Sequence, residues 1–504
     1  MAVSIVSLAI LARLLEPADF GLLALGTVWH GLLGVVRDFG LPLAAVHHGA
    51  SGRGVDGALL ERLHRHNLRL QGALALSSLA AGPLFALAYG DPRLRGVVWA
   101  LSAATVFLGT ASPPRALLIG EVRFATLAGV EVAGAAAGAV LAVAWAVGGG
   151  GYWALVLFHA GRGAVSSALL WAAAGWRPRR WLPRRRRSSP GDGRDVGGAA
   201  SDLPAEVRGY GRRSTWARMV AYLGRHLDRA LLGFFVPTAA LGFYQQARRW
   251  SSVPAQGLQA PLLEVAVSLL SHRRGEPAAL RAGFTAASRA ALCLTLPVLT
   301  FLLVEAPTAV ALLLGPGWEP VVPLLRLLAG AFLVAAPLAQ VKWLFLALGR
   351  TRRQLAWTTA VSLAQVVAVA VAASAGTTRV AMALLAVAVV TTPASVAYAC
   401  AGTPVKPRDF AAALAPAALA AALAAGAVVV AAPMLAGLAA RAGGATSTPA
   451  LTVAAPGLAA AAARGLAAGV LFLAVYTAGL ALSGWGPRRL IKDLRRLRAS
   501  PSGD

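Results

Sequence analysis

The chain alternates long apolar runs with short segments that hold charge, glycine or proline. Most of these runs approach the ~20 residues that a helix needs to cross the hydrocarbon core of a bilayer. The pattern therefore predicts an all-α polytopic membrane protein with about 14 transmembrane helices, the first of them short. The predicted spans are residues 1–15, 20–46, 67–89, 97–114, 124–147, 152–174, 214–236, 240–270, 283–304, 321–348, 355–375, 380–400, 410–440 and 452–483.

Basic residues divide unevenly between the connections and predict the topology. The connections after even-numbered spans, together with the C-terminal tail, hold 30 Lys and Arg, whereas those after odd-numbered spans hold four. Because cytoplasmic loops carry the excess of positive charge, we expect both termini and every even-numbered connection in the cytoplasm. Residues 1–15 lack a basic leader, so we expect a transmembrane helix there rather than a signal peptide.

The longest connection, residues 175–213, is a basic linker with four consecutive arginines at 184–187. It separates residues 1–174, which hold helices 1–6, from residues 214–400, which hold helices 7–12. Residues 401–483 are expected to form two further helices, and residues 484–504 a basic cytoplasmic tail. We therefore predict two six-helix lobes followed by two C-terminal helices.

A faint repeat indicates that the two lobes are related by pseudo-symmetry. Pro17 is followed by Phe20 and Gly21 where span 2 opens, and Pro237 is followed by Leu241 and Gly242 where span 8 opens. Duplicated halves in secondary transporters flank a central binding site.

Span 7 carries an unusual stripe of polar side chains. Arg218, Tyr222, Arg225 and Arg229 lie at i, i+4, i+7 and i+11, which places them on one face of a helix. Charge within a bilayer is costly and usually marks a pathway or a ligand site. Arginine suits a diphosphate because its planar fork donates two parallel hydrogen bonds. We interpret the stripe as the lining of a cavity for an anionic cargo.

Neighbouring charges leave a second interpretation open. Asp228 lies beside Arg229, and span 8 contributes Arg248 and Arg249. These four side chains could bind substrate, or they could form a buried ion-pair network that ties spans 7 and 8 together.

The first lobe holds further candidates. Arg37 and Arg162 are candidate substrate-binding residues, although Arg37 and Arg218 also lie near enough to the cytoplasmic face to snorkel. Glu131 and Asp38 are candidates for ion coupling, and Glu131 could instead serve as the partner of Arg162.

The remaining composition excludes several classes of protein. The net charge is +27, but the basic residues lie in short loops between apolar spans, which argues against a nucleic-acid partner. There is no phosphate-binding loop of the G-x-x-x-x-G-K type, and the two cysteines, Cys293 and Cys400, have no metal or redox spacing. We expect no cofactor, no metal site and no catalytic residue, and hence a protein that is not an enzyme.

Seven segments, in the order in which they occur, resemble the oligosaccharide (Wzx-like) flippases of the multidrug/oligosaccharidyl-lipid/polysaccharide exporter superfamily. The resemblance covers about residues 8–410. The segments are LARLLEPADFG at 11–21, RDFGL at 37–41, GYWALV at 151–156, LDRALLG at 227–233, ALGFY at 240–244, GPGW at 315–318 and ALGR at 347–350.

This resemblance implies a flippase in the cytoplasmic membrane. Such proteins carry a polyprenyl-diphosphate-linked oligosaccharide between leaflets by alternating access of two lobes, for the synthesis of cell-surface polysaccharide. The family's cation-lined lumen would map to Arg225 and Arg229, with Asp228 at the recurrent aspartate. The expected partners are the lipid-linked substrate, membrane lipids, and the glycosyltransferases and polymerase of the same pathway.

Three other functions remain as alternatives. A cation-coupled multidrug exporter of the same superfamily would place acidic rather than basic side chains in its cavity. A lipid II flippase would differ only in its cargo. A membrane glycosyltransferase or polymerase would need carboxylates and a sizeable outer loop.

Overall fold

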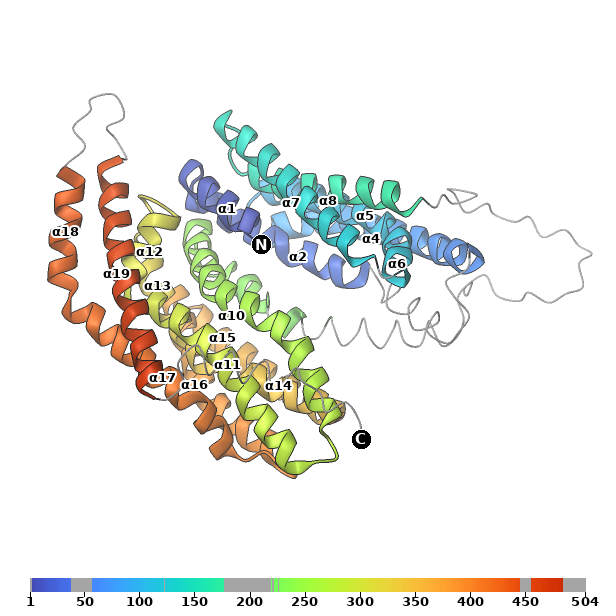
Figure 1. Cartoon of the computed structure of the whole chain (residues 1–504). Helices are drawn as coiled ribbons and strands as arrows, with labels where there is room; N and C mark the ends of the chain where they lie inside the picture. The colour runs from blue at the N-terminus through green and yellow to red at the C-terminus, as the bar shows by residue number, and fades with distance from the viewer. Residues whose placement is uncertain are drawn as a thin grey trace, which may run out of the picture. The chain divides into compact units, whose positions relative to one another are not determined.

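The computed structural model describes residues 2–37, 57–121, 123–175, 219, 222–224, 226–444 and 455–483. Within these ranges every regular element is an α-helix, as the apolar pattern predicts (Figure 1). The helices are α1 (Ala2–Leu14), α2 (Pro17–Arg37), α4 (Gly57–Tyr89), α5 (Arg93–Thr110), α6 (Ser112–Gly120), α7 (Phe124–Val147), α8 (Trp153–Ala174), α10 (Thr238–His272), α11 (Pro277–Val304), α12 (Ala306–Leu313), α13 (Val321–Ala335), α14 (Leu338–Ala347), α15 (Thr351–Ala373), α16 (Thr377–Cys400), α17 (Pro407–Val430), α18 (Ala432–Gly444) and α19 (Ala455–Leu482).

In the described part of the chain, ten helices are long and apolar enough to cross a membrane, or 11 if the bent pair α5 and α6 is one span. The multi-pass membrane fold is therefore confirmed, but the count of fourteen is not. The other three predicted spans are the short α1, the long and more polar α10, and residues 214–236, part of which lies outside the described residues.

Two compact units make up the chain, residues Met1–Gly242 and Phe243–Asp504. In the first unit α7 packs along α8, α4 along α5, and α5 contacts both α2 and α8. In the second unit α17 packs against α11 and α19, while α16 packs against α13 and α15. The predicted division into lobes at a linker of residues 175–213 stays a prediction, because that segment lies outside the described residues.

The plain, alanine-rich composition of the last two predicted spans has a packing role. Buried alanines of α17, among them Ala413, Ala417 and Ala420, contact a core that includes Phe472 and Tyr476 of α19. Small residues let membrane helices approach closely and gain dispersion energy that lipid cannot replace. The low sequence complexity of this region is therefore compatible with a specific interface.

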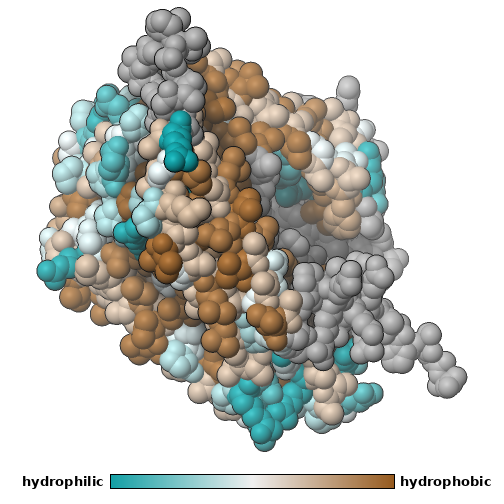
Figure 2. Space-filling view, turned by 60° about the vertical axis from the view of Figure 1, so that its left-hand side comes forward, coloured by the Kyte–Doolittle hydropathy of each residue, from teal (hydrophilic) through white to brown (hydrophobic). Residues whose placement is uncertain are grey.

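The outer surface of the helices suits a hydrocarbon solvent. On α15 the side chains of Leu363, Val367 and Val371 repeat every fourth residue and are 57–77% exposed. Figure 2 shows one face of the molecule on which hydrophobic side chains form a broad continuous area, with hydrophilic side chains near its lower and left edges. Such an area on a water-soluble monomer would be a strong liability, whereas in a bilayer it is the expected solvent-facing surface.

The two repeat motifs meet each other in the first unit. A Cβ atom on Gly21 would lie 1.8 Å from the carbonyl oxygen of Thr238, and one on Gly242 would lie 1.9 Å from that of Pro17. The first turns of α2 and α10 therefore touch backbone to backbone in a reciprocal arrangement. This contact gives the faint sequence repeat a structural meaning, because each glycine is required by the opening turn of the other motif.

An ion pair links α19 to the junction of α11 and α12 within the second unit. Glu305, whose side chain is 2% exposed, lies between α11 and α12 and accepts hydrogen bonds from Arg464 Nε and Nη2, both at 3.2 Å. Thr308 Oγ1 also donates to Glu305 Oε2. Arg464 is the only charged residue of α19, so this pair fixes the position of an otherwise apolar helix.

We expect Glu305→Ala to destabilise the protein by about 3–5 kcal/mol, because it leaves the Arg464 guanidinium partly buried without its counter-charge. Thermal unfolding of the purified protein in detergent measures the effect. The double variant Glu305→Ala, Arg464→Leu should recover much of the loss, since it removes both charges. A double variant as unstable as the single one would show that packing at this position, and not the ion pair, holds α19.

Candidate functional site

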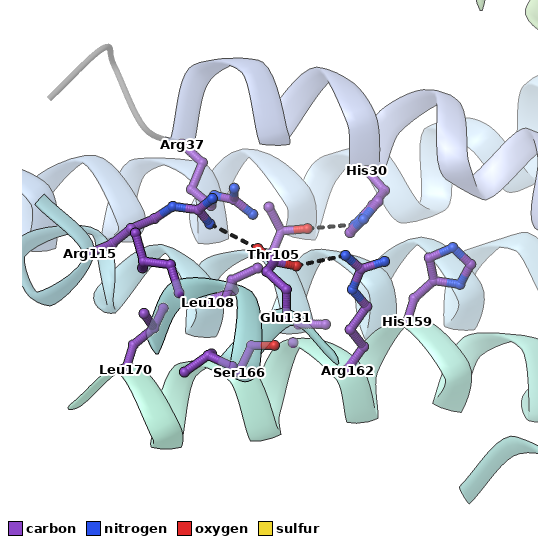
Figure 3. A pocket seen from close by; sticks show the side chains of 14 residues that line it. His30, Arg37, Thr105, Leu108, Arg115, Glu131, His159, Arg162, Ser166 and Leu170 are labelled. Carbon is purple, nitrogen blue, oxygen red and sulfur yellow. Dashed lines mark hydrogen bonds and ion pairs between the residues drawn. The ribbon is translucent and has the colours of Figure 1, made fainter. Parts of the chain in front are cut away.

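The first unit encloses a polar cavity of about 250 Å³ between five helices. Its walls come from α2, α5, α6, α7 and α8, and three arginines, one glutamate and two histidines contribute to them (Figure 3). The lining residues are His30, Arg37, Ala104, Thr105, Leu108, Arg115, Leu127, Val130, Glu131, His159, Arg162, Gly163, Ser166 and Leu170. So many ionisable groups among transmembrane helices indicate a functional site.

Glu131 bridges two arginines in this cavity. Its Oε2 lies 2.8 Å from Arg162 Nη2, and its Oε1 lies 3.3 Å from Arg115 Nη1. Figure 3 shows the two guanidinium groups approaching the carboxylate from opposite sides. The three side chains are 39–44% exposed, so they face the open space of the cavity and are not locked into the core.

Two glycines of α7 bring Arg162 to Glu131. A Cβ atom on Gly138 would lie 2.4 Å from the carbonyl oxygen of Phe158, and one on Gly134 would lie 2.0 Å from Ser166 Oγ. Glycines four residues apart form a flat strip on one helix face, against which α8 can pack closely. Glu131 lies one turn before this strip, and the close approach places Arg162 within reach of its carboxylate.

A bend between α5 and α6 directs Arg115 toward the same carboxylate. The bent pair of α5 and α6 turns by 42° at Ala111, and α6 opens with Pro113 and Pro114 in its first turn. Proline favours the first turn of a helix and cannot continue a preceding one without disruption. Arg115 follows directly, so the bend delivers its side chain to the cavity.

Buried amides hold the end of α2 where Arg37 enters the cavity wall. Gln71 Nε2 donates to the Arg37 carbonyl at 3.2 Å and to Asn67 Oδ1 at 2.9 Å, and Asn67 Nδ2 donates to the Gly109 carbonyl at 2.7 Å. This chain of hydrogen bonds joins α2, α4 and α5. It fixes the backbone at Arg37, while the guanidinium group remains at the cavity.

Histidine, threonine and serine side chains complete the lining. The ring nitrogen Nδ1 of His30 lies 2.5 Å from Thr105 Oγ1, and the His30 and His159 rings meet edge to face at 6.0 Å. The buried Ser166 Oγ has no hydrogen-bond partner among the residues that the structure describes. A polar ligand in the cavity would meet both donors and acceptors here.

Three of the residues singled out from sequence come together in this cavity: Arg37, Glu131 and Arg162. The contact of Glu131 with Arg162 is the pairing that we weighed as an alternative to ion coupling. Sequence reasoning missed Arg115, which we assigned to a cytoplasmic loop. The proline pair after Ala111 is the signal that could have placed Arg115 on a bent helix end.

The stripe predicted on span 7 is only partly described. Arg218 and Arg225 of the stripe lie outside the described residues, as does Asp38, the second candidate for ion coupling. Tyr222 donates to the carbonyl oxygens of Thr27 and Val28 of α2, both at 3.0 Å.

Asp228 and Arg229 also belong to the first unit, but neither they nor Tyr222 are among the cavity residues. Asp228 is buried, and its Oδ1 accepts a hydrogen bond from the backbone N–H of Arg229 at 2.9 Å. Arg248 and Arg249 lie on α10 in the second unit, where Arg248 Nη1 donates to Tyr244 Oη at 3.4 Å. Substrate binding by these residues stays a prediction.

Comparison with known proteins identifies relatives of this chain. Residues 10–189 and 202–323 match the family described as "Polysaccharide biosynthesis protein". Over 328 residues the chain is 22% identical to the lipopolysaccharide biosynthesis protein WzxC of Escherichia coli (strain K12), covering 65% of this chain and 63% of that protein. Over 120 residues it is 26% identical to the teichuronic acid biosynthesis protein TuaB of Bacillus subtilis (strain 168), covering 24% of this chain and 25% of TuaB. The matches thus span less than two thirds of either relative.

Two solved structures share the fold. The lipid II flippase MurJ in an inward-closed conformation superposes with a TM-score of 0.71 at 11% identity, covering 97% of both chains. An inward-facing multidrug resistance transporter of the MATE family superposes with a TM-score of 0.63 at 15% identity, covering 81% of this chain and 94% of the transporter. The family match covers more than half of the chain, and the chain belongs to the polysaccharide biosynthesis protein family.

Proposed function

We propose that this protein is a flippase that moves a polyprenyl-diphosphate-linked oligosaccharide across the cytoplasmic membrane for the synthesis of cell-surface polysaccharide. The observation that carries the proposal is the cavity lined by Arg37, Arg115 and Arg162, the last two of which pair with one carboxylate, that of Glu131. Three guanidinium groups provide the donor geometry that phosphate oxygens need. Membership of a polysaccharide biosynthesis family supplies the matching class of cargo.

The cavity position suits substrate entry from the cytoplasm. With the topology that the basic loops predict, the start of α7 lies on the cytoplasmic side, and Glu131 is about 10 Å along the helix at ~1.5 Å per residue. Arg37 ends α2 on the same side. The diphosphate would bind these arginines, the lipid tail would stay in the bilayer, and rocking of two lobes would re-open the site outward.

Arg218, Tyr222, Arg225 and Arg229 remain candidate substrate contacts, as do Arg248 and Arg249 of α10. Both termini would lie in the cytoplasm, and the chain would act as a transporter and not as an enzyme. The glycosyltransferases and polymerase of the same pathway are the expected partners.

The charge of the cavity favours this cargo over that of a multidrug exporter. Cationic drugs would be repelled by three arginines that face a single glutamate. Lipid II carries the same diphosphate linkage and is the second candidate, supported by the superposition on the lipid II flippase. The two cargoes differ in their glycan and not in the group that the arginines would bind.

Deletion of the gene from its native host tests the function. We expect lipid-linked oligosaccharides to accumulate on the cytoplasmic leaflet and surface polysaccharide to disappear, with recovery when the intact chain is restored. Loss of peptidoglycan synthesis would instead favour a lipid II flippase. A change confined to drug susceptibility would contradict the proposal and favour multidrug export.

A further inference from the structure

We propose that Glu131 is a displaceable counter-anion, which keeps small anions out of the arginine cavity until a diphosphate takes its place. The inference rests on the proposed function and adds a specificity-determining role to one residue of the site. Glu131 supplies the counter-charge of Arg115 and Arg162 when no ligand is bound. Only a ligand that binds several arginines at once would therefore displace the carboxylate.

The geometry of Glu131 resembles that of a bound phosphate. Each of its two oxygens accepts a hydrogen bond from a different guanidinium group, at 2.8 Å from Arg162 and 3.3 Å from Arg115. A phosphate group presents its oxygens to paired arginines in the same way. The carboxylate thus occupies the position that one phosphate of the cargo would take between the two arginines.

Exposure of the three side chains allows the exchange. Glu131 is 41% exposed and Arg162 is 44% exposed, so the pair borders open space. A half-exposed ion pair is worth little because solvent competes with it, in contrast to a fully buried one. The side chain of Glu131 can therefore move away from both arginines, and no unpaired charge is left buried in an apolar core.

Charge in the cavity sets the threshold for a ligand. Among the described lining residues there are three arginines and a single carboxylate, so that arginines outnumber carboxylates by two. A diphosphate ester brings at least two negative charges and offers oxygens to more than two arginines. A single phosphate gains contact with two arginines but only replaces what Glu131 already gives them.

Among the described residues that line the cavity, Glu131 is the one carboxylate. The ionisable side chains lining the cavity are Arg115 from α6, Arg162 and His159 from α8, and Arg37 and His30 from α2. Glu131 is the only charged residue of α7, and α1, which also packs on α7, contributes only Arg13 in its last turn.

Binding to the purified full-length protein in nanodiscs tests the proposal, with farnesyl diphosphate and inorganic phosphate as probes in calorimetry. Wild type should bind the diphosphate and show no binding of inorganic phosphate at millimolar concentration. Glu131→Gln, which removes the counter-charge and keeps the shape, should bind the diphosphate about tenfold more tightly and gain measurable phosphate binding.

Glu121→Gln is the matched control, because Glu121 forms a similar exposed pair with Arg123, at 3.3 Å, and does not line the cavity. It should bind both probes as wild type does. Should Glu131→Gln not fold, Glu131→Asp serves instead, since the shorter side chain cannot reach both arginines, and the same direction of change is expected.

The outcomes separate this inference from the proposed function. Equal affinities of wild type and a folded Glu131 variant for the diphosphate would overturn the counter-anion role alone. Failure of wild type to bind the diphosphate at all would remove the cavity as the phosphate site, and with it the basis of both proposals.

Discussion

Replacement of Arg115 and Arg162 together by glutamine is expected to abolish export of polysaccharide. Each guanidinium group that binds a phosphate oxygen contributes about 1.5–3 kcal/mol, so the double change should weaken binding of the cargo by about 100-fold or more. The loss comes from the binding site and not from the fold, because both side chains are about 40% exposed. Surface polysaccharide in cells that depend on this protein provides the measurement.

Arg123→Gln controls for loss of positive charge near the same membrane face. Arg123 is exposed, pairs with Glu121 and does not line the cavity, so its replacement should leave export close to normal. The level of protein in the membrane must match wild type in both strains. Normal export by the Arg115 and Arg162 double variant would show that the cargo's phosphates bind elsewhere, with the predicted stripe around Arg229 as the next candidate.

Gly21→Ala and Gly242→Ala are each expected to prevent accumulation of the folded protein. The new methyl group would lie 1.8–1.9 Å from a backbone carbonyl oxygen, which no change of rotamer can relieve. Separation of the two helix ends at this crossing should cost about 3 kcal/mol or more, at the upper end of overpacked cores. The amount of monodisperse protein extracted from the membrane is the readout.

Gly34→Ala is the control within the same helix, α2, because a Cβ atom there meets nothing within 4 Å. Alanine favours helix over glycine by about 1 kcal/mol, so this variant should be as abundant as wild type or more so. Equal abundance of the Gly21 and Gly34 variants would mean that the two repeat motifs do not pack as tightly as described.

Much of the fold follows from the sequence because bilayer thickness and backbone hydrogen bonding leave few choices. A membrane-spanning apolar run of about 20 residues must be a helix. The predicted span 124–147, for example, has the same bounds as α7. Breaks within runs were not foreseen. Proline at 113 and 114 bends one span, and the run at 410–440 divides into α17 and α18 at Ala431.

The site was harder to predict because it depends on which helices are neighbours. Arg37, Glu131 and Arg162 stood out from sequence since charge within a span is costly. Their assembly with Arg115 and the two histidines requires the close approach of α7 to α8 at the glycines. A single sequence does not show which helices approach each other. The family resemblance predicts a binding site on span 7, whereas the described cavity lies among α2, α5, α6, α7 and α8.

Movement of a lipid-linked diphosphate in proteoliposomes tests the central claim most directly. The purified chain is reconstituted with a fluorescent oligosaccharide on a polyprenyl diphosphate, and the label that remains accessible to a membrane-impermeant quencher is followed over time. We predict rapid translocation with wild type, and only the rate of protein-free vesicles with the Arg115 and Arg162 double variant. Translocation at the wild-type rate by that variant would contradict the account.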